Sequence, residues 1–187
     1  MVIIDRRIIT GLFLLLFMAT QSYAIGGTKS PKLHNTSVSR TMSKASEYVD
    51  QYKEAAMEQM RRYGIPASIT LAQGILESGS GQSELSRKGI NHFGIKATSS
   101  WLENGGSYLV YADDKPNEKF CQYASVADSY EHHSLFLKSN KRYSELFKLP
   151  PDDYVGWTKG LQAAGYATDN RYAASLQAVI RSHGLDK

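Results

Sequence analysis

The feature that most constrains the fold of this chain is an apolar helix pattern within residues 65–85, which read IPASITLAQGILESGSGQSEL. Pro66 suits the first helical position, and apolar side chains cover most of the circumference that follows. We therefore expect a buried helix around which the rest of the domain is organised. One strip of it, at positions i, i+3, i+4 and i+7, is polar or small: Thr70, Gln73, Gly74 and Glu77. Another group could approach the backbone closely along this strip.

Glu77 stands in the last turn of this helix, and Ser78 and Gly79 after it end the helix. Partial desolvation and the negative end of the helix dipole both disfavour its anion, so we expect them to raise its pKa. A carboxylic acid with a raised pKa can donate a proton near neutral pH, which makes Glu77 a candidate general acid. The alternative is a glutamate that points into water at a helix end.

The start of the chain has the pattern of an export signal. A short basic region precedes an apolar run over residues 8–19, and small residues around Ala24 suit cleavage. The apolar run is shorter than the ~20 residues that span a bilayer. We predict a signal peptide over residues 1–24, with an uncleaved anchor as the alternative.

Residues 25–42 are rich in Gly, Ser, Thr and Lys and predict a flexible linker. The remaining residues, 43–187, suffice for one domain and are too few for two substantial ones. We expect an exported, monomeric protein that is secreted or periplasmic, without stable membrane insertion once the signal is removed.

Composition narrows the function classes. A formal net charge of +4 suits a partner that is an anionic polymer, but it is too weak and dispersed to indicate nucleic acid. The single cysteine, Cys121, allows no internal disulfide, so stability must come from an ordinary core.

Hydrophobic periodicity and caps predict a mainly α (α+β) domain. A first helix begins near Ser43 and ends at Gly64, and a short turn of helix covers residues 83–88. Turn signals around residues 105–106 and 113–117 enclose β-favouring residues, which predicts a hairpin whose second strand runs over 120–123. Three later helices have these candidate N-caps: Ser125, then Asp152, then Thr168 or Asp169.

Neither a metal nor another cofactor is indicated. Adjacent histidines such as His132 and His133 point about 100° apart on a helix and cannot easily share a metal ion. Cys121 is expected to be a buried, inert thiol, and the chain has no Gly-rich phosphate loop or GxSxG motif.

Carboxylates and aromatic rings are the chemistry that remains. The 12 Tyr, 6 Phe and 2 Trp would suit a groove for sugars, although they could equally fill the core. The hairpin carries three further acids, Asp113, Asp114 and Glu118. They could fold over the end of the Glu77 helix, or the two aspartates could be ordinary turn residues.

Four ordered motifs carry a family resemblance: Leu71-Ala72-Gln73 with Leu76-Glu77-Ser78-Gly79; Asn91 with Phe93-Gly94-Ile95-Lys96; Ser129-Tyr130 with His133 and Phe136-Leu137; and Ala163-Ala164-Gly165-Tyr166-Ala167-Thr168-Asp169 with Tyr172. Together, over residues 46–184, they resemble glycoside hydrolase family 73, the β-N-acetylglucosaminidases that include many autolysins and a flagellar muramidase-like domain. The resemblance implies a lysozyme-like helical fold with a small β-hairpin lobe. It also implies cleavage of peptidoglycan glycan strands after N-acetylglucosamine.

The resemblance assigns roles to individual residues. Glu77 matches the general acid, and Tyr166 matches a tyrosine near the reacting sugar. Asp113 or Asp114 is the best match for a second acid, with Glu118 less well placed. The residues expected to bind substrate are Gln73, Phe93, Gly94, Lys96 and Tyr172. Ser80 departs from the tryptophan of many members, which removes an aromatic surface but no catalytic group.

Other functions stay open at this point. A lytic transglycosylase also uses one glutamate in a Glu-Ser pair, but a Gly-Leu-Met-Gln-like segment usually follows, whereas this chain has Phe93-Gly94-Ile95-Lys96. A non-catalytic wall-binding module would tolerate loss of the acids, and a structural envelope protein would bind no glycan. For a hydrolase, inverting, retaining and substrate-assisted routes are all compatible with the sequence.

Overall fold

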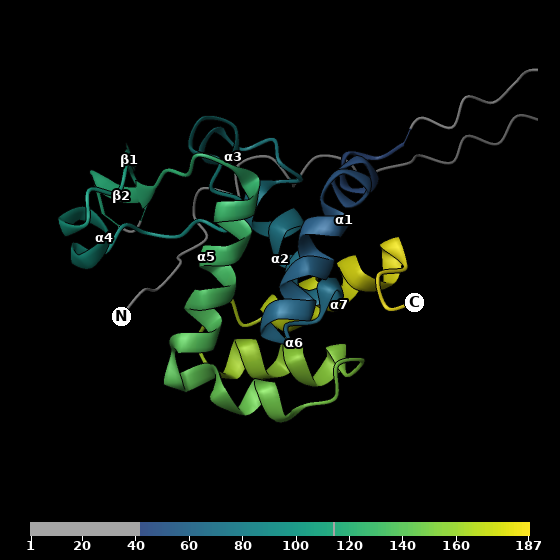
Figure 1. Ribbon diagram of the computed structural model, residues 1–187. Helices are drawn as coiled ribbons and strands as arrows, with labels where there is room; N and C mark the ends of the chain where they lie inside the picture. The colour runs from purple at the N-terminus through teal and green to yellow at the C-terminus, as the bar shows by residue number, and fades with distance from the viewer. Residues whose placement is uncertain (1–41, 114) are drawn as a thin grey trace, which may run out of the picture.

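The computed structural model describes residues 42–113 and 115–187. The predicted signal peptide, nearly all of the predicted linker, and Asp114 lie outside the described residues, so the predicted domain boundaries stay predictions. The elements, in chain order, are α1 (Lys44–Tyr63), α2 (Ala67–Ser78), α3 (Glu84–Gly89), α4 (Ser99–Glu103), β1 (Tyr108–Tyr111), β2 (Glu118–Cys121), α5 (Val126–Ser139), the 3-10 helix η1 (Lys141–Lys148), α6 (Tyr154–Ala163) and α7 (Tyr172–His183). Helices with one small antiparallel sheet confirm the predicted mainly α class (Figure 1).

Local caps set the ends of α1 as predicted. The Ser43 hydroxyl accepts a hydrogen bond from the Ser46 amide at 3.1 Å. At the other end Gly64 is left-handed, with φ 77°, and its amide donates to the Met60 carbonyl. The helix therefore begins and ends where short-range signals place it.

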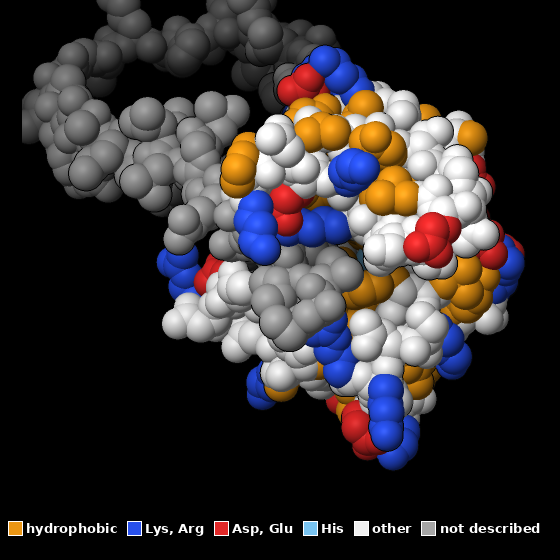
Figure 2. All heavy atoms as spheres, turned by 90° about the vertical axis from the view of Figure 1, so that its left-hand side faces the viewer, with side chains coloured by type: hydrophobic (Ala, Val, Ile, Leu, Met, Phe, Trp, Pro, Cys, Tyr) orange, Lys and Arg blue, Asp and Glu red, His pale blue; other side chains and the backbone are white. Residues whose placement is uncertain are grey.

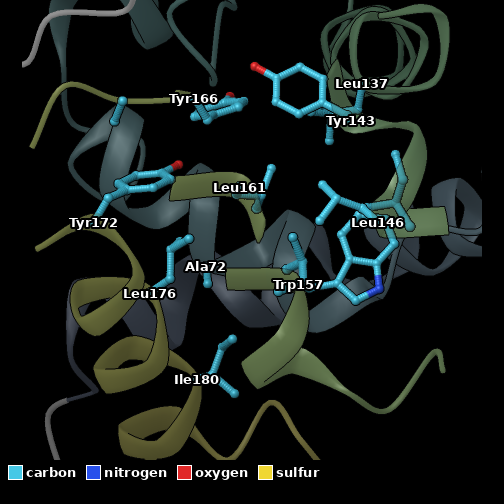
Figure 3. Packing of buried hydrophobic residues seen from close by; sticks show 13 residues of the cluster. Ala72, Leu137, Tyr143, Leu146, Trp157, Leu161, Tyr166, Tyr172, Leu176 and Ile180 are labelled. Carbon is cyan, nitrogen blue, oxygen red and sulfur yellow. The ribbon is translucent and has the colours of Figure 1, made fainter. Parts of the chain in front are cut away.

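The helix α2 is the centre of the fold. Nine of its twelve residues are buried, and it packs against α1, α6 and α7. Ile69 and Ala72 belong to one hydrophobic cluster, which α5, η1, α6 and α7 complete (Figure 3). Leu71 and Ile75 belong to a second cluster, formed with α1, residues 93–95 and β2. The prediction of a buried, organising helix is confirmed.

The two strands pair antiparallel, with Tyr108 opposite Cys121 and Tyr111 opposite Glu118. Residues 95–97 extend this sheet along β2, because the Cys121 amide donates to the Ile95 carbonyl at 2.9 Å and the Ala97 amide donates to the Lys119 carbonyl at 2.8 Å. We call β1, β2, α4 and residues 95–97 together the β-lobe. It lies to one side of the helices, at the left of Figure 1.

Several predicted boundaries are wrong. The second strand starts at Glu118 and not at Phe120, because its pairing with β1 begins opposite Tyr111. Asp153, and not Asp152, caps α6 by accepting from the Gly156 amide at 2.8 Å.

The start of α7 differs as well. Its N-cap is Arg171, without a side-chain cap bond, and neither Thr168 nor Asp169 takes that position. The Asp169 carboxylate instead accepts from the Arg171 amide in the preceding turn. The short elements α4 and η1 were not predicted. No helix in the described part of the chain is both long enough and apolar enough to cross a membrane.

Candidate active site

Glu77 lies in the last turn of α2, and its side chain is largely buried, with 8% of the residue exposed. The turn that follows is tightly braced. The Ser78 hydroxyl donates back to the Gly74 carbonyl at 2.5 Å and accepts from the Gly81 amide at 2.7 Å. Gly79 is left-handed and its amide bonds the Ile75 carbonyl. The carboxyl group is therefore carried on a firmly held helix end.

Two side chains connect Glu77 to the interior. The Tyr172 hydroxyl, at the start of α7, donates to Glu77 Oε1 at 2.9 Å. The same hydroxyl accepts from Gln73 Nε2, also at 2.9 Å. Burial, and then the neighbouring Glu77 carboxylate, raise the pKa of Tyr172 well above its usual range, so the phenol remains a neutral donor. Tyr172 thus contacts Glu77 directly and Gln73 contacts Tyr172, and substrate binding by Gln73 and Tyr172 stays a prediction.

Tyr166 lies in the turn between α6 and α7. Its ring stacks on Tyr172, with centroids 5.5 Å apart and planes at 9°, and Figure 3 shows the two rings one above the other. Its edge contacts are to His133 and Phe136. The structure therefore brings Tyr166 next to the residue that bonds Glu77. Its role beside a reacting sugar stays a prediction.

Gly74, the smallest residue of the polar strip on α2, is covered by a side chain from another helix of the protein. A β-carbon at Gly74 would collide with the hydroxyl and ring of Tyr48 on α1. The Tyr48 hydroxyl hydrogen-bonds His92 Nδ1 and the Tyr130 hydroxyl, each at 2.9 Å. The group that approaches the α2 backbone at Gly74 is therefore Tyr48.

The segment 91–96 links the Glu77 region to the β-lobe. Asn91 holds it by donating to the Ile95 and Cys121 carbonyls and accepting from the Ile95 amide. Phe93 is fully buried and stacks on His133, with ring centroids 3.9 Å apart. The Phe93 ring therefore supports the segment from within, and substrate contact by this residue and by Gly94 stays a prediction.

Lys96 joins the hairpin acids. Its Nζ lies 3.0 Å from Asp113 Oδ2 and 2.9 Å from Glu118 Oε1. All three side chains are mostly buried, at 15%, 3% and 18% exposure respectively. We call these three residues the Lys96 cluster. Asp114 lies outside the described residues, so its position adds nothing to the choice among the hairpin acids.

The outer face of the β-lobe is partly apolar. Tyr108 and Val110 on β1 are 41% and 48% exposed. The Lys119 ammonium lies 4.5 Å from the centroid of the Tyr108 ring. Viewed from the side of this lobe, Lys and Arg side chains lie among hydrophobic ones (Figure 2). An aromatic ring beside a cation can contact a polymer that has both apolar and anionic parts.

Among residues 42–113 and 115–187, no group of three or more His, Cys, Asp or Glu side chains is arranged to hold a metal ion. The two adjacent histidines have separate surroundings: His132 Nδ1 bonds the Tyr123 hydroxyl, whereas His133 is buried against Phe93. Burial raises the pKa of the Cys121 thiol to about 11, which makes it a poor nucleophile.

Sequence reasoning missed how the site is held together. It found Glu77, Tyr172 and Lys96 individually, but not the bond from Tyr172 to Glu77 or the ion pairs of Lys96 with Asp113 and Glu118. Tyr172 is 95 positions after Glu77, and no local pattern signals that pairing. Lys115 and Lys119 are closer to the hairpin acids in the sequence than Lys96 is, so the sequence does not single out Lys96 as their partner.

The fold resembles that of known enzyme domains. The catalytic domain of the autolysin Auto from Listeria monocytogenes superposes with a TM-score of 0.66 at 28% identity, covering 80% of this chain and 90% of that domain. The glycoside hydrolase domain of Salmonella typhimurium FlgJ gives a TM-score of 0.61 at 30% identity, covering 75% and 88%. The fold is therefore that of a glycoside hydrolase domain, as the lysozyme-like prediction requires.

Residues 53–185 match the glucosaminidase family, described as mannosyl-glycoprotein endo-beta-N-acetylglucosaminidase. The exo-glucosaminidase LytG of Bacillus subtilis is 26% identical over 193 residues, which cover 97% of this chain and 67% of LytG. The peptidoglycan hydrolase FlgJ of Salmonella typhimurium is 30% identical over 166 residues, covering 81% of this chain but only 50% of FlgJ. The chain belongs to the glucosaminidase family, glycoside hydrolase family 73.

Proposed function

We propose that this protein is an exported peptidoglycan hydrolase that cleaves the β-1,4 bond between N-acetylglucosamine and N-acetylmuramic acid, with Glu77 as the general acid. The observation that carries the proposal is the bond from the Tyr172 hydroxyl to Glu77 Oε1, at 2.9 Å, which joins the first and the fourth of the motifs that carry the family resemblance. Relatives named as peptidoglycan hydrolases and as an exo-glucosaminidase support the substrate.

The surroundings of Glu77 fit the work of an acid. The carboxyl group is largely withdrawn from water, and Tyr172, its partner among the described residues, is a neutral phenol. A carboxylic acid held in this way protonates the glycosidic oxygen as an oxocarbenium-like transition state develops.

Three routes then complete the reaction. A hairpin carboxylate ~6.5–9.5 Å from Glu77 would activate water on the opposite face and invert the anomeric centre. A separation of ~5–5.5 Å would suit a covalent intermediate and retention. In the third route the substrate's own acetamide attacks, and the hairpin acid orients it. We assign the second carboxylate to Asp113 or Asp114, and Glu118 is the alternative.

Export places the enzyme with its substrate. The basic and apolar pattern of residues 1–24 supports a secreted or periplasmic location. Removal of these residues, with Asp5, Arg6 and Arg7, lowers the formal charge from +4 to +3, and this excess favours an anionic wall polymer. We propose a monomer, because Glu77, Tyr172, Lys96 and Asp113 all come from one chain.

The test is digestion of purified peptidoglycan by the full chain and by its Glu77→Gln variant, with products reduced by borohydride and read by mass spectrometry. Reduced N-acetylglucosamine ends are expected for wild type, with a rate about a thousandfold lower for the variant. Glu84→Gln, which changes an exposed glutamate at the start of α3, is the matched control and should keep full activity.

The other outcomes separate the alternatives. Products lighter by one water would identify a lytic transglycosylase. Monosaccharide release from chain ends without internal fragments would indicate exo action. Binding without cleavage by both proteins would identify a wall-binding module and would remove Glu77 from its role.

A further inference from the structure

We propose that Lys96 is a positioning residue for the hydrolytic reaction, acting through Asp113 and Glu118. Its ammonium holds both side chains in place and favours the anion of Asp113, so that the β-lobe supplies a base or a counter-charge while Glu77 supplies the proton. This inference rests on the proposed function. It also replaces the earlier expectation that Lys96 binds substrate.

The first support is the burial of the Lys96 cluster. The Asp113 side chain is only 3% exposed, and its Oδ2 lies 3.0 Å from Lys96 Nζ. A carboxylate so far withdrawn from water is costly unless a cation or several donors compensate it. The same ammonium lies 2.9 Å from Glu118 Oε1. One cation therefore holds both ends of the turn that joins β1 to β2.

The second support is the rigid placement of Lys96. Its backbone forms an antiparallel bridge with Phe120, and its neighbours Ile95 and Ala97 are hydrogen-bonded to β2. The ammonium also lies 5.8 Å from the centroid of the Phe120 ring. The exposed pair of Lys88 and Glu84 differs, because both of its side chains are more than half exposed and joined only within one helix.

The third support is the division of labour between the two acids. Glu118 uses both oxygens, since Oε1 faces Lys96 and Oε2 accepts from the Lys115 amide at 3.2 Å. It therefore braces the turn. Asp113 pairs with the same ammonium from the end of β1, where the chain leaves the strand. We infer that Lys96 acts on the reaction chiefly through Asp113.

Charge also favours this role. Two carboxylates and one ammonium leave the Lys96 cluster with one net negative charge. Of the other cations on the hairpin, Lys119 lies over the Tyr108 ring, and Lys115 contacts the cluster through its backbone amide.

In the inverting route, Glu77 gives its proton to the glycosidic oxygen as the C1–O bond breaks. Water then forms the new C1–O bond and gives its proton to the hairpin carboxylate.

The test compares Lys96→Met, which keeps the aliphatic stem, with Lys96→Arg, which keeps the charge. The measurements are the pH profiles of kcat and kcat/KM on peptidoglycan and the thermal midpoint. For Lys96→Met we expect kcat to fall at least tenfold and the acidic limb of the profile to move to higher pH, because the Asp113 carboxylate loses its cation. Lys96→Arg should recover activity to within a few-fold, and Lys88→Met should match wild type throughout.

Three results would overturn the inference. A lower thermal midpoint with an unchanged pH profile would mean that Lys96 is purely structural. A raised KM with unchanged kcat would mean that it binds substrate. If wild type cleaves nothing, the proposed function fails, and the carboxyl carbon titration of Asp113 by NMR still tests the pairing. Identical titration curves in wild type and Lys96→Met would then refute it.

Discussion

The end of α2 and the hairpin of the β-lobe both carry acids, but they hold them with opposite kinds of partner. Glu77 accepts a hydrogen bond from the neutral phenol of Tyr172, whereas Asp113 and Glu118 share the ammonium of Lys96. A neutral donor leaves a carboxyl group able to carry a proton, while a cation favours the anion. Under the proposed function, we expect this difference to suit the two regions to different halves of one acid–base reaction.

The two regions also differ in how they are fixed. The end of α2 is surrounded by buried aromatic rings and braced by Ser78. The β-lobe has a two-stranded sheet whose first strand is half exposed, and its turn depends on ion pairs. We expect the acid to be held rigidly and the hairpin to be the more adjustable partner.

After the loss expected for Glu77→Gln, the next largest effect tests whether the hairpin acids are equivalent. Asp113→Asn should lower kcat/KM by about a hundredfold, because it removes the acid that we assign to the reaction. Glu118→Gln should cost less than about tenfold, because its single carbonyl oxygen can still accept from Lys96, and only the bond from the Lys115 amide is lost. Steady-state cleavage of peptidoglycan measures both. The reverse order would assign the reacting role to Glu118.

A smaller effect tests the hydrogen bond from the neutral Tyr172 phenol to Glu77. Tyr172→Phe should lower kcat about tenfold and destabilise the fold by about 1–3 kcal/mol, since Glu77 and Gln73 both lose a buried partner. Urea unfolding and kinetics would measure the two quantities. The matched control is Tyr143→Phe, because the buried Tyr143 hydroxyl has no hydrogen-bond partner among the described residues. Equal losses in the two variants would contradict the role of Tyr172.

The smallest expected effect on activity comes from the buried histidines His92 and His133. Their main effect is expected on the stability of the fold. Burial lowers the pKa of His92 to about 4 and that of His133 to about 3, from 6.5. The unfolded chain then binds more protons than the native protein below pH 6.5. Stability from this source is fully present above pH 6.5 and is lost as the pH falls toward 4.

Urea unfolding between pH 7 and pH 4 measures this loss. Each histidine contributes a slope of up to about 1.4 kcal/mol per pH unit. His133→Phe keeps a ring stacked on Phe93 and should remove one such slope while changing activity little at pH 7. An unchanged slope would show that His133 is protonated in the native state.

The sequence predicted those parts of the fold that depend on neighbouring residues. Ser43 and Ser125 cap the starts of α1 and α5, and Gly64 caps the end of α1. Each does so by a bond to an amide or carbonyl within four positions, so these roles can be seen locally. The 3-10 helix η1 and the five-residue α4 have no comparable periodicity, since runs of that length are stabilised mainly by packing. The second strand was misplaced by two residues because its start depends on β1.

The same distinction applies to the candidate site. Glu77 could be proposed from one helix alone, because desolvation and the helix dipole are local effects. The bonds to Tyr172 and to Lys96 join segments that only the folded chain brings together. The structure pairs Gln73 and Lys96 with other side chains of the protein, and their predicted contact with substrate stays a prediction.

Opposite faces of α2 belong to the two hydrophobic clusters, and this has a consequence for how the domain unfolds. Neither cluster can close without that helix, so the two lobes share one cooperative unit. Calorimetry should therefore show a single transition for the β-lobe and the helices together. A fragment that ends on either side of α2 would leave one hydrophobic cluster incomplete. We expect such a fragment to be sensitive to proteases and inactive.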